Sequence, residues 1–333
     1  PSGMSSLWQG YGRDSLQIYK RLQDQVDITV RQHGSIYLAS DDGEMALLYE
    51  LQEINRSSDY PCTLLGRDVC LERYPGLKSD YCVGGLFFPE EISVEPRRMI
   101  YRVLQYLQQQ DGFYYHSDTL VVGAWVANGK SMVEDSRGNV YAAGKVIICN
   151  GTDVQTLYPD LFAASDLEVT KLQMMQTVAQ PHLIIPGNVL TGLIIRRYES
   201  FRACPSYTRV RATESPSALW KRWGVHILFK QGTDGSVIIG DSHQYADARN
   251  QDELGFDEDQ EINRYILTLA QDIFDLEDWT LQRQWSGYYS QIASGDILRH
   301  TVDKHIHIVT GIGGKGMTAG PGYSRANLKK IFS

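Results

Sequence analysis

The sequence predicts a mixed α/β (α+β) fold with two domains, one discontinuous and the other an antiparallel-sheet domain. Helical and strand patterns are mixed along the 333 residues, and residues 166–245 are rich in strand patterns. Two buried-looking strands that end in glycine turns, 145–149 and 305–309, lie far apart in the chain. A chain of this length has ample core for such an arrangement. The simplest architecture that fits these observations is a domain assembled from distant segments, with a sheet domain inserted into it.

Hydrophobic residues three and four positions apart predict several amphipathic helices. The predicted helices cover residues 14–27, 41–55, 95–111, 262–273 and 323–331. An acidic first turn favours the start of the second helix, because acidic side chains complement the helix dipole there. The third helix opens at Glu95-Pro96, since proline suits the first helical position, and Gly112 ends it. The acidic segment 252–261 is expected to be a solvated loop that leads into the fourth helix.

Short β-branched and apolar runs bounded by turn residues predict the strands. The predicted strands cover residues 35–39, 113–116, 119–126, 131–135, 145–149, 170–178, 190–198, 224–230, 236–240 and 305–309. Asn128-Gly129 and residues 137–139 supply tight turns for a β-meander, and residues 233–235 join a further pair of strands. Proline and glycine breaks make residues 60–90 a predicted loop region.

Composition excludes several classes of function. The net charge of −8 argues against nucleic acid as the main partner, because phosphate binding needs a basic face. The sequence has no apolar run of membrane-spanning length and no visible signal peptide, so we expect a cytoplasmic protein without a membrane partner. Five scattered cysteines fit reduced thiols and neither a disulfide framework nor a metal knuckle. His305 and His307 are interpreted as structural, and no metal site is expected.

The most informative segment is glycine-rich and follows the predicted strand 305–309. Gly311, Gly313, Gly314 and Gly316 crowd into six positions ahead of a helix. Glycine lets a backbone approach a ligand closely, and a helix N-terminus offers free N–H groups to an anion or an electron-rich ring. The pattern is typical of a nucleotide-type cofactor site, but an ordinary glycine-rich turn between strand and helix has the same spacing.

Three separated motifs resemble the D-amino-acid-oxidase-like superfamily of FAD-dependent oxidoreductases, which includes glycine and sarcosine oxidases. Residues 310–322 resemble the C-terminal flavin loop of that superfamily. Residues 85–96 resemble its segment before an acidic-Pro helix start, and residues 145–151 resemble its strand that closes on the dinucleotide. The resemblance implies a discontinuous, Rossmann-like FAD-binding domain and an antiparallel-sheet substrate domain. No cysteine stands where a covalent flavin link would be expected, so the implied FAD is non-covalent.

The match is closer to one branch of this superfamily. Five segments resemble the FAD-dependent oxidoreductases that are linked to 2-aminoethylphosphonate breakdown. They are residues 171–174, 196–205, 223–226, 239–243 and 285–289. The resemblance implies oxidation of an N-alkyl-2-aminoethylphosphonate-like amine by hydride transfer to flavin and imine hydrolysis, with an electron acceptor such as oxygen. A glycine- or sarcosine-type amino acid oxidase is the alternative.

One departure from the family concerns its first βαβ unit, which carries the G-x-G-x-x-G motif. This sequence contains no such unit and opens with residues that resemble the small-residue turn after it. A further interpretation is therefore a truncated, FAD-free and non-catalytic binding module. The expected FAD-binding domain, without that unit, comprises residues 1–34, 85–165 and 285–333. The expected substrate domain comprises residues 35–84 and 166–284.

The resemblance assigns cofactor contacts to the opening turn, the adenine-side strand, the turn after residue 149 and the glycine-rich loop. These candidates are Gly3, Met4, Val121, Asn150, Gly151, Gly311, Gly313, Gly314, Lys315, Gly316, Met317 and Thr318. Lys315 is of interest because a positive charge near the ring stabilises anionic reduced flavin, although a solvent-exposed position suits it equally.

Candidate substrate contacts lie in the strand-rich region and in an aromatic segment after it. Arg196 and Tyr198 are two apart on a predicted strand and so share a face. The branch resemblance favours Arg196 binding a phosphonate through paired N–H groups; a surface position at a strand end is the alternative. His226 and His243 are candidates to orient the substrate amine or accept its proton. Tyr289 is a candidate substrate contact, and for all three a structural role in the core is the alternative.

Overall fold

The computed structural model describes residues 1–333, with the exception of the Ser6 side chain. The α-helices are α1 Ser6–Gln25, α2 Asp42–Ser57, α3 Arg67–Arg73, α4 Pro96–Gln108, α5 Pro159–Ala163, α6 Gly192–Ile195, α7 Tyr207–Ala212, α8 Leu219–Arg222, α9 Gln260–Ile273 and α10 Gly316–Phe332. Short 3-10 turns are η1 Glu199–Ala203, η2 Gln251–Leu254 and η3 Gly313–Lys315. Within the described residues, no helix combines the length and apolarity that a membrane crossing needs.

The strands form three sheets. They are β1 Ser35–Ala39, β2 Thr63–Gly66, β3 Gly84–Phe88, β4 Val121–Ala127, β5 Lys130–Asp135, β6 Val140–Ala143, β7 Val146–Ile148, β8 Leu167–Ala179, β9 Asn188–Leu190, β10 Leu228–Gln231, β11 Ser236–Gly240, β12 Gln244–Asp247, β13 Leu281–Ile292, β14 Leu298–Val302 and β15 Ile306–Thr310.

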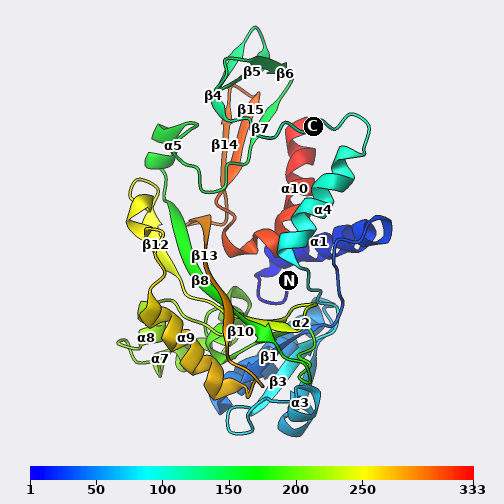
Figure 1. The fold of residues 1–333 in the computed structure, drawn as a ribbon, viewed down its shortest axis with the longest axis vertical. Helices are drawn as coiled ribbons and strands as arrows, with labels where there is room; N and C mark the ends of the chain where they lie inside the picture. The colour runs from blue at the N-terminus through cyan, green and yellow to red at the C-terminus, as the bar shows by residue number, and fades with distance from the viewer.

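A mixed nine-stranded sheet has the order β12-β8-β11-β10-β9-β1-β3-β2, with β13 also paired to β8. Its pairs are antiparallel apart from β1 and β9, which run parallel. Figure 1 shows the long strands β8 and β13 running side by side from the lower part of the molecule toward the smaller sheets above. Their ladder extends from the pair Leu281–Thr177 to the pair Ile292–Leu167. A continuous antiparallel ribbon therefore joins the two parts of the molecule.

Strand β1 is buried on both faces of the large sheet. Ile36 and Leu38 belong to a hydrophobic cluster that includes the apolar face of α9. Tyr37 and Ala39 belong to a second cluster, which includes the buried leucines of α2. Successive side chains of a strand point to opposite faces, so an uninterrupted apolar run needs cover on both sides. The large sheet is thus the middle layer between helices α2 and α9.

Strands β7 and β15, the two predicted strands that end in glycine turns, pair in a three-stranded sheet with the order β14-β15-β7. They run parallel, with Ile306 opposite Val146 and Ile308 opposite Ile148. Because the carboxyl ends of parallel strands meet at the same edge of a sheet, the turns after β7 and β15 come together. The meander β4-β5-β6 forms a separate antiparallel sheet next to them (Figure 1). The prediction that distant segments build one discontinuous unit is confirmed.

Helices α1 and α10 pack closely against each other beside this unit (Figure 1). Gly322 on α10 permits the contact, because a Cβ there would lie 2.1 Å from the carbonyl oxygen of Tyr11. The Gly322 N–H donates to the hydroxyl of Ser15 on α1 at 2.9 Å. Trp8 and Tyr323 stack with ring centroids 5.6 Å apart. These contacts hold α10, which follows the glycine-rich turn, against α1.

Two strand predictions are wrong. Residues 190–198 are not a strand: β9 ends at Leu190 and α6 begins at Gly192. The adjacent residues Ile194 and Ile195 are both fully buried in the same cluster, which a strand's alternation of faces does not allow. Residues 113–116 also lack strand structure, and the third strand of the meander is the wholly exposed β6. A strand without a buried face has no alternating pattern to reveal it.

The predicted loop region 60–90 instead contains β2, α3 and β3. Gly84 and Gly85 lie within β3, where a Cβ on Gly85 would be 2.8 Å from Ile36 Cδ1. Glycine here allows close packing between strands rather than a turn. The expected domain boundaries at 84/85 and 284/285 consequently fall inside β3 and β13, which both belong to the large sheet.

Candidate active site

The turns after β7 and β15 contain glycines with positive φ angles and free space beside them. Gly151, Gly311 and Gly313 have φ angles of 61°, 73° and 66°, a region that favours glycine. A Cβ on Gly151 would meet no atom within 4 Å, and one on Gly314 would meet the Tyr289 hydroxyl oxygen at 3.8 Å and nothing nearer. The space beside both turns is therefore available to a bound molecule.

A cavity of ≈ 280 Å³ lies beside β4 and β7. Its lining is mainly apolar and includes Val121, Val146, Ile148 and Asn150. The side-chain oxygen of Asn150 is buried and has no hydrogen-bond partner within the described residues. A buried acceptor without a partner is costly, and a bound molecule with N–H donors would satisfy it. Two predicted cofactor contacts, Val121 and Asn150, thus line one cavity.

Helix α10 begins directly after the glycine-rich turn, so residues 316–318 form its first turn. The N–H groups of a first helical turn lack partners within the helix and attract electron-rich ligand atoms. Lys315, immediately before the helix, is paired through its ammonium with Glu199 at 3.1 Å and with Asp296 at 3.5 Å. These carboxylates balance the charge of Lys315, which counts against a free positive charge at this position.

The opening turn connects this region with the large sheet. The Gly3 backbone packs against the Tyr198 ring, since a Cβ on Gly3 would lie 2.2 Å from Tyr198 Cδ2. Met4 packs against a buried cluster that includes Trp8, and Ile312 of the glycine-rich turn packs against the same cluster. Gly3 and Met4 therefore lie between a predicted substrate contact and the predicted flavin loop.

A compact group of titratable side chains lies beyond the end of the β10–β11 hairpin. His226 precedes β10, and Asp241 and His243 follow β11, so antiparallel pairing brings the three together. His226 Nε2 lies 3.0 Å from Asp241 Oδ1, and His243 Nδ1 lies 3.7 Å from the same oxygen. The two imidazole rings stack with centroids 5.1 Å apart. We call His226, Asp241 and His243 the histidine–aspartate cluster.

Tyrosines connect the histidine–aspartate cluster to the glycine-rich turn. Tyr198 packs edge-on against His226 with ring centroids 6.2 Å apart, and Tyr289 packs edge-on against His243 at 6.3 Å. The Tyr289 hydroxyl oxygen also faces Gly314. The cluster on the large sheet and the turn after β15 therefore share Tyr289 as a common wall.

Arg197 is a cationic side chain beside this cluster. Its guanidinium donates to the Tyr245 hydroxyl at 2.8 Å and to the Gly224 carbonyl at 3.4 Å. The same carbonyl lies 3.4 Å from Nδ1 of His226 and 3.3 Å from Nδ1 of His243. The Gly224 carbonyl thus holds Arg197 and both imidazoles around one point.

The prediction that Arg196 and Tyr198 share a strand face is wrong. Helix α6 ends just before Arg196, and the Arg196 side chain lies among carboxylates instead of beside the histidine–aspartate cluster. Its ion-pair partners are Asp41 at 2.5 Å, Glu44 at 2.6 Å and Glu214 at 3.8 Å. These partners neutralise Arg196, and it is the neighbouring Arg197 that lies beside the histidine–aspartate cluster.

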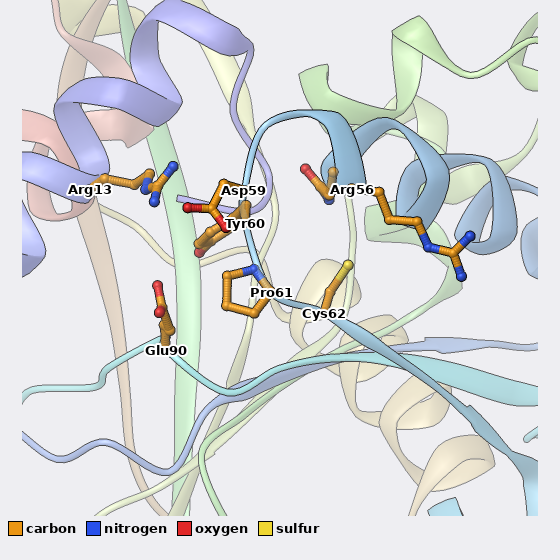
Figure 2. Close-up of a pocket in the computed structure, with 8 residues that line it drawn as sticks. Arg13, Arg56, Asp59, Tyr60, Pro61, Cys62 and Glu90 are labelled. Atoms are coloured by element: carbon orange, nitrogen blue, oxygen red, sulfur yellow. The ribbon is translucent and has the colours of Figure 1, made fainter.

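A second hollow lies apart from these groups. Figure 2 shows this cavity of ≈ 260 Å³, where Arg13 from α1 approaches Tyr60 while Arg56 on α2 points away. The lining includes both acidic and basic side chains, among them Glu90 and Arg13. None of the predicted site residues contributes to the lining among the residues described, so this hollow is separate from the candidate active site.

Comparisons with known proteins decide the family. A family model described as FAD dependent oxidoreductase (DAO) matches residues 4–326. The chain belongs to this family. A comparison with curated proteins gave no match.

Solved structures of low sequence identity share the fold of this oxidoreductase. Glycine oxidase from Geobacillus kaustophilus is 17% identical with a TM-score of 0.72, over 96% of this chain and 76% of that one. Iminodiacetate oxidase from Chelativorans sp. BNC1 is 15% identical with a TM-score of 0.71, over 97% and 79%. L-α-glycerophosphate oxidase from Mycoplasma pneumoniae, with FAD bound, is 14% identical with a TM-score of 0.75, over 100% and 83%.

FAD is accordingly the cofactor of this oxidoreductase. The residues present fit it: the backbone is open at Gly151 and Gly314, and an apolar cavity contains the partnerless Asn150 oxygen. The first turn of α10 would add N–H donors. The turns after β7 and β15, with the cavity beside them, could therefore hold FAD.

Burial controls protonation in the histidine–aspartate cluster of the oxidoreductase. Burial raises the pKa of Asp241 to about 7, and the charge of Arg197 opposes this rise. Burial, and secondarily Arg197, lowers the pKa of His243 to about 3. The pKa of His226 lies well below its usual range, first through burial and then through the charge of His243. Burial also raises the pKa of the Tyr198 hydroxyl. Both imidazoles and this phenol are therefore uncharged at neutral pH.

Three further side chains of the site are not among those predicted from the sequence: Arg197, Asp241 and Tyr245. Asp241 follows β11 within a short polar segment that has the composition of a turn. A polar segment directly after a buried, β-branched strand is also where site residues gather, and this is the signal that sequence offers for Asp241. The Arg196-Arg197 pair is visible in the sequence, but which of the two arginines faces the site depends on the local backbone conformation.

Proposed function

We propose that this FAD-dependent oxidoreductase oxidises a small amine that carries an anionic group. The observation that carries the proposal is the placement of Arg197 beside imidazoles that are uncharged at neutral pH, close to the loop that would hold the flavin. A guanidinium attracts an anion more strongly in a partly buried site than in water, because the local dielectric is lower. The likeness to structures named glycine oxidase and iminodiacetate oxidase supports an amine of this kind.

Arg197 is proposed to bind the anionic end of the substrate. A guanidinium has five N–H donors, of which one contacts Tyr245 and one contacts Gly224. The remaining donors are available to oxygens of a carboxylate or phosphonate, while the two protein contacts keep the planar group in place. Pre-organised binding of this kind fixes the position of the rest of the substrate.

The amine is proposed to lie against the histidine–aspartate cluster. Uncharged imidazoles offer nitrogen lone pairs to an amine N–H, so His226 and His243 would orient the nitrogen without repelling its charge. Tyr198 and Tyr289 would form the walls that exclude water. When bound, FAD accepts a hydride from the carbon next to the nitrogen. The imine product then hydrolyses in water.

The finer proposal concerns which anion the substrate carries. We propose an N-alkyl-2-aminoethylphosphonate-like amine, supported by the five segments that resemble the aminophosphonate branch. Glycine or sarcosine is the second candidate, supported by the likeness to glycine oxidase over 96% of this chain. A guanidinium binds both anions through paired N–H groups, so the position of Arg197 is compatible with either.

The test is flavin reduction in the FAD-loaded protein with N-methyl-2-aminoethylphosphonate, sarcosine and glycine. The phosphonate is expected to give the largest kcat/KM; a larger value for sarcosine or glycine would replace it with the amino acid. An Arg197→Lys variant is expected to lose roughly ten- to a hundredfold in kcat/KM, the equivalent of about 1.5–3 kcal/mol for one charge-assisted contact. Arg202→Lys is the matched control because Arg202 is exposed. Equal kinetics in both variants would refute the role of Arg197.

We also infer that the partners of this oxidoreductase are small molecules, namely the amine and an electron acceptor such as oxygen. A cytoplasmic location is proposed as well. All five cysteines are free thiols in the structure as described, which suits a reducing compartment. Cell fractionation with a native-level epitope tag tests the location, and recovery from another compartment would contradict it.

A further inference from the structure

The histidine–aspartate cluster has the composition and spacing of a metal site. His226, Asp241 and His243 each offer one ligand atom, and these atoms all lie within 4.8 Å of one another. We propose that the three side chains bind one divalent transition-metal ion of the zinc class. This inference depends on the geometry of the cluster. The ion would use the imidazole lone pairs that the proposed function gives to the substrate amine, so zinc and substrate are expected to compete.

The distances within the cluster suit a shared ion. Zinc binds imidazole nitrogen and carboxylate oxygen at about 2.0–2.2 Å, so two ligand atoms at angles of 90–109° are about 2.8–3.6 Å apart. His226 Nε2 is 3.0 Å from Asp241 Oδ1, and His243 Nδ1 is 3.7 Å from it. His243 Nδ1 also contacts the Gly224 carbonyl at 3.3 Å, and because a carbonyl can only accept, this nitrogen carries the proton. The His243 ring must therefore turn over and present Nε2 to complete the coordination.

The hydrogen bonds of the cluster leave a place for a cation. The Gly224 carbonyl can only accept, so its contact with His226 Nδ1 at 3.4 Å puts the proton on Nδ1 and the lone pair on Nε2. That lone pair faces Asp241 Oδ1, which is buried and has no hydrogen-bond partner among the described residues. Two acceptors at 3.0 Å repel unless a proton or a metal ion lies between them, and a proton on Asp241 is the alternative that the zinc titration tests. A backbone carbonyl that fixes the far nitrogen of an imidazole is also the usual support for a metal-binding histidine.

The ligand set indicates the kind of ion. Two imidazoles and one carboxylate suit zinc and related divalent transition metals, and they leave a coordination position open. The side chains of His226, Asp241 and His243 are 5%, 13% and 6% exposed, so the small opening is at the carboxylate. Arg197 opposes a cation here and favours an anion at the open position. We therefore expect micromolar affinity rather than the tighter binding of structural zinc sites.

The test is calorimetric titration of the full FAD-loaded chain with Zn²⁺ after treatment with a chelator. One ion per chain is expected, and Asp241→Asn and His243→Gln are each expected to weaken binding at least tenfold. His305→Gln is the matched control, because His305 lies outside the cluster and contacts the Gly144 carbonyl. Absence of stoichiometric binding at micromolar protein, or unchanged affinity in both cluster variants, would overturn the proposal.

A second measurement needs no variant, so misfolding of the variants cannot affect its result. Anomalous X-ray scattering at the zinc edge from crystals of the unmutated protein locates the ion directly. A peak between His226, Asp241 and His243 supports the proposal, and a peak confined to other residues overturns it. Flavin reduction by substrate in chelated protein reports on the proposed function separately, so either inference can fail without the other.

Discussion

Replacing Glu44 by Gln is expected to destabilise the fold and to leave substrate binding unchanged. Glu44 is 2% exposed and accepts from Arg196 Nε at 2.6 Å, from the Ser40 N–H at 2.8 Å and from the Ser40 hydroxyl at 2.7 Å. Gly192 makes room for the carboxylate, since a Cβ there would lie 2.2 Å from Glu44 Oε2. The amide of glutamine removes the charge from a tightly enclosed site and presents N–H groups to donors.

The size of the effect follows from burial. Removing one partner of a buried ion pair costs about 3–5 kcal/mol, and the lower end applies because Asp41 still faces Arg196. We therefore expect about 3 kcal/mol less unfolding free energy in urea titrations. The matched control is Glu53→Gln on the same helix, where the carboxylate is 61% exposed and pairs with Arg56. An exposed pair contributes at most about 1 kcal/mol.

Substrate kinetics give the decisive comparison for Arg196. The KM of folded Glu44→Gln protein should match that of the unmutated protein, because Arg196 lies among carboxylates and not beside the histidine–aspartate cluster. A tenfold change in KM together with unchanged unfolding would refute this reasoning and would return Arg196 to the substrate site.

The remaining predictions concern glycines. Gly314→Val is expected to abolish FAD binding in fluorescence titrations with little change in thermal unfolding, because the protein atom nearest to its Cβ is the Tyr289 hydroxyl at 3.8 Å. Titration equal to the parent would show that Gly314 does not approach the cofactor. Gly322→Ala is expected to lower the melting temperature by several degrees, because its Cβ would lie 2.1 Å from the Tyr11 carbonyl oxygen. Gly320→Ala on the same helix, with nothing within 4 Å, should not lower it.

Much of the fold is predictable because burial leaves a periodic trace in the sequence. The predicted helix at 262–273 and strand at 35–39 match α9 and β1, since each buries a regular set of side chains. The glycine turns of 145–151 and 305–316 also identify the two parallel strands that meet at the cofactor loop. The glycines of β3 mislead because they serve close packing, and nothing in a single sequence separates that role from a turn.

The candidate site is less predictable, because its residues are brought together by tertiary pairing. His226 and His243 are identified from sequence, but only the antiparallel pairing of β10 and β11 brings His226 to Asp241 and His243. The choice of Arg196 over Arg197 follows from assuming strand periodicity where a helical turn precedes. The helical turn before Arg196 directs the Arg197 guanidinium, and not that of Arg196, toward the histidine–aspartate cluster.

The β8–β13 ribbon has a mechanical consequence for this enzyme. Near the end of β13, the Ser290 hydroxyl donates to the Gly151 carbonyl at 2.8 Å and accepts from the Gly311 N–H at 3.2 Å. One side chain therefore connects the turns after β7 and β15. The neighbouring Tyr289 reaches the other way, to His243. A slip of one residue in this ladder would exchange the two faces and turn Tyr289 away from the histidine–aspartate cluster. The spacing between the proposed flavin loop and the histidine–aspartate cluster is thus set by strand register.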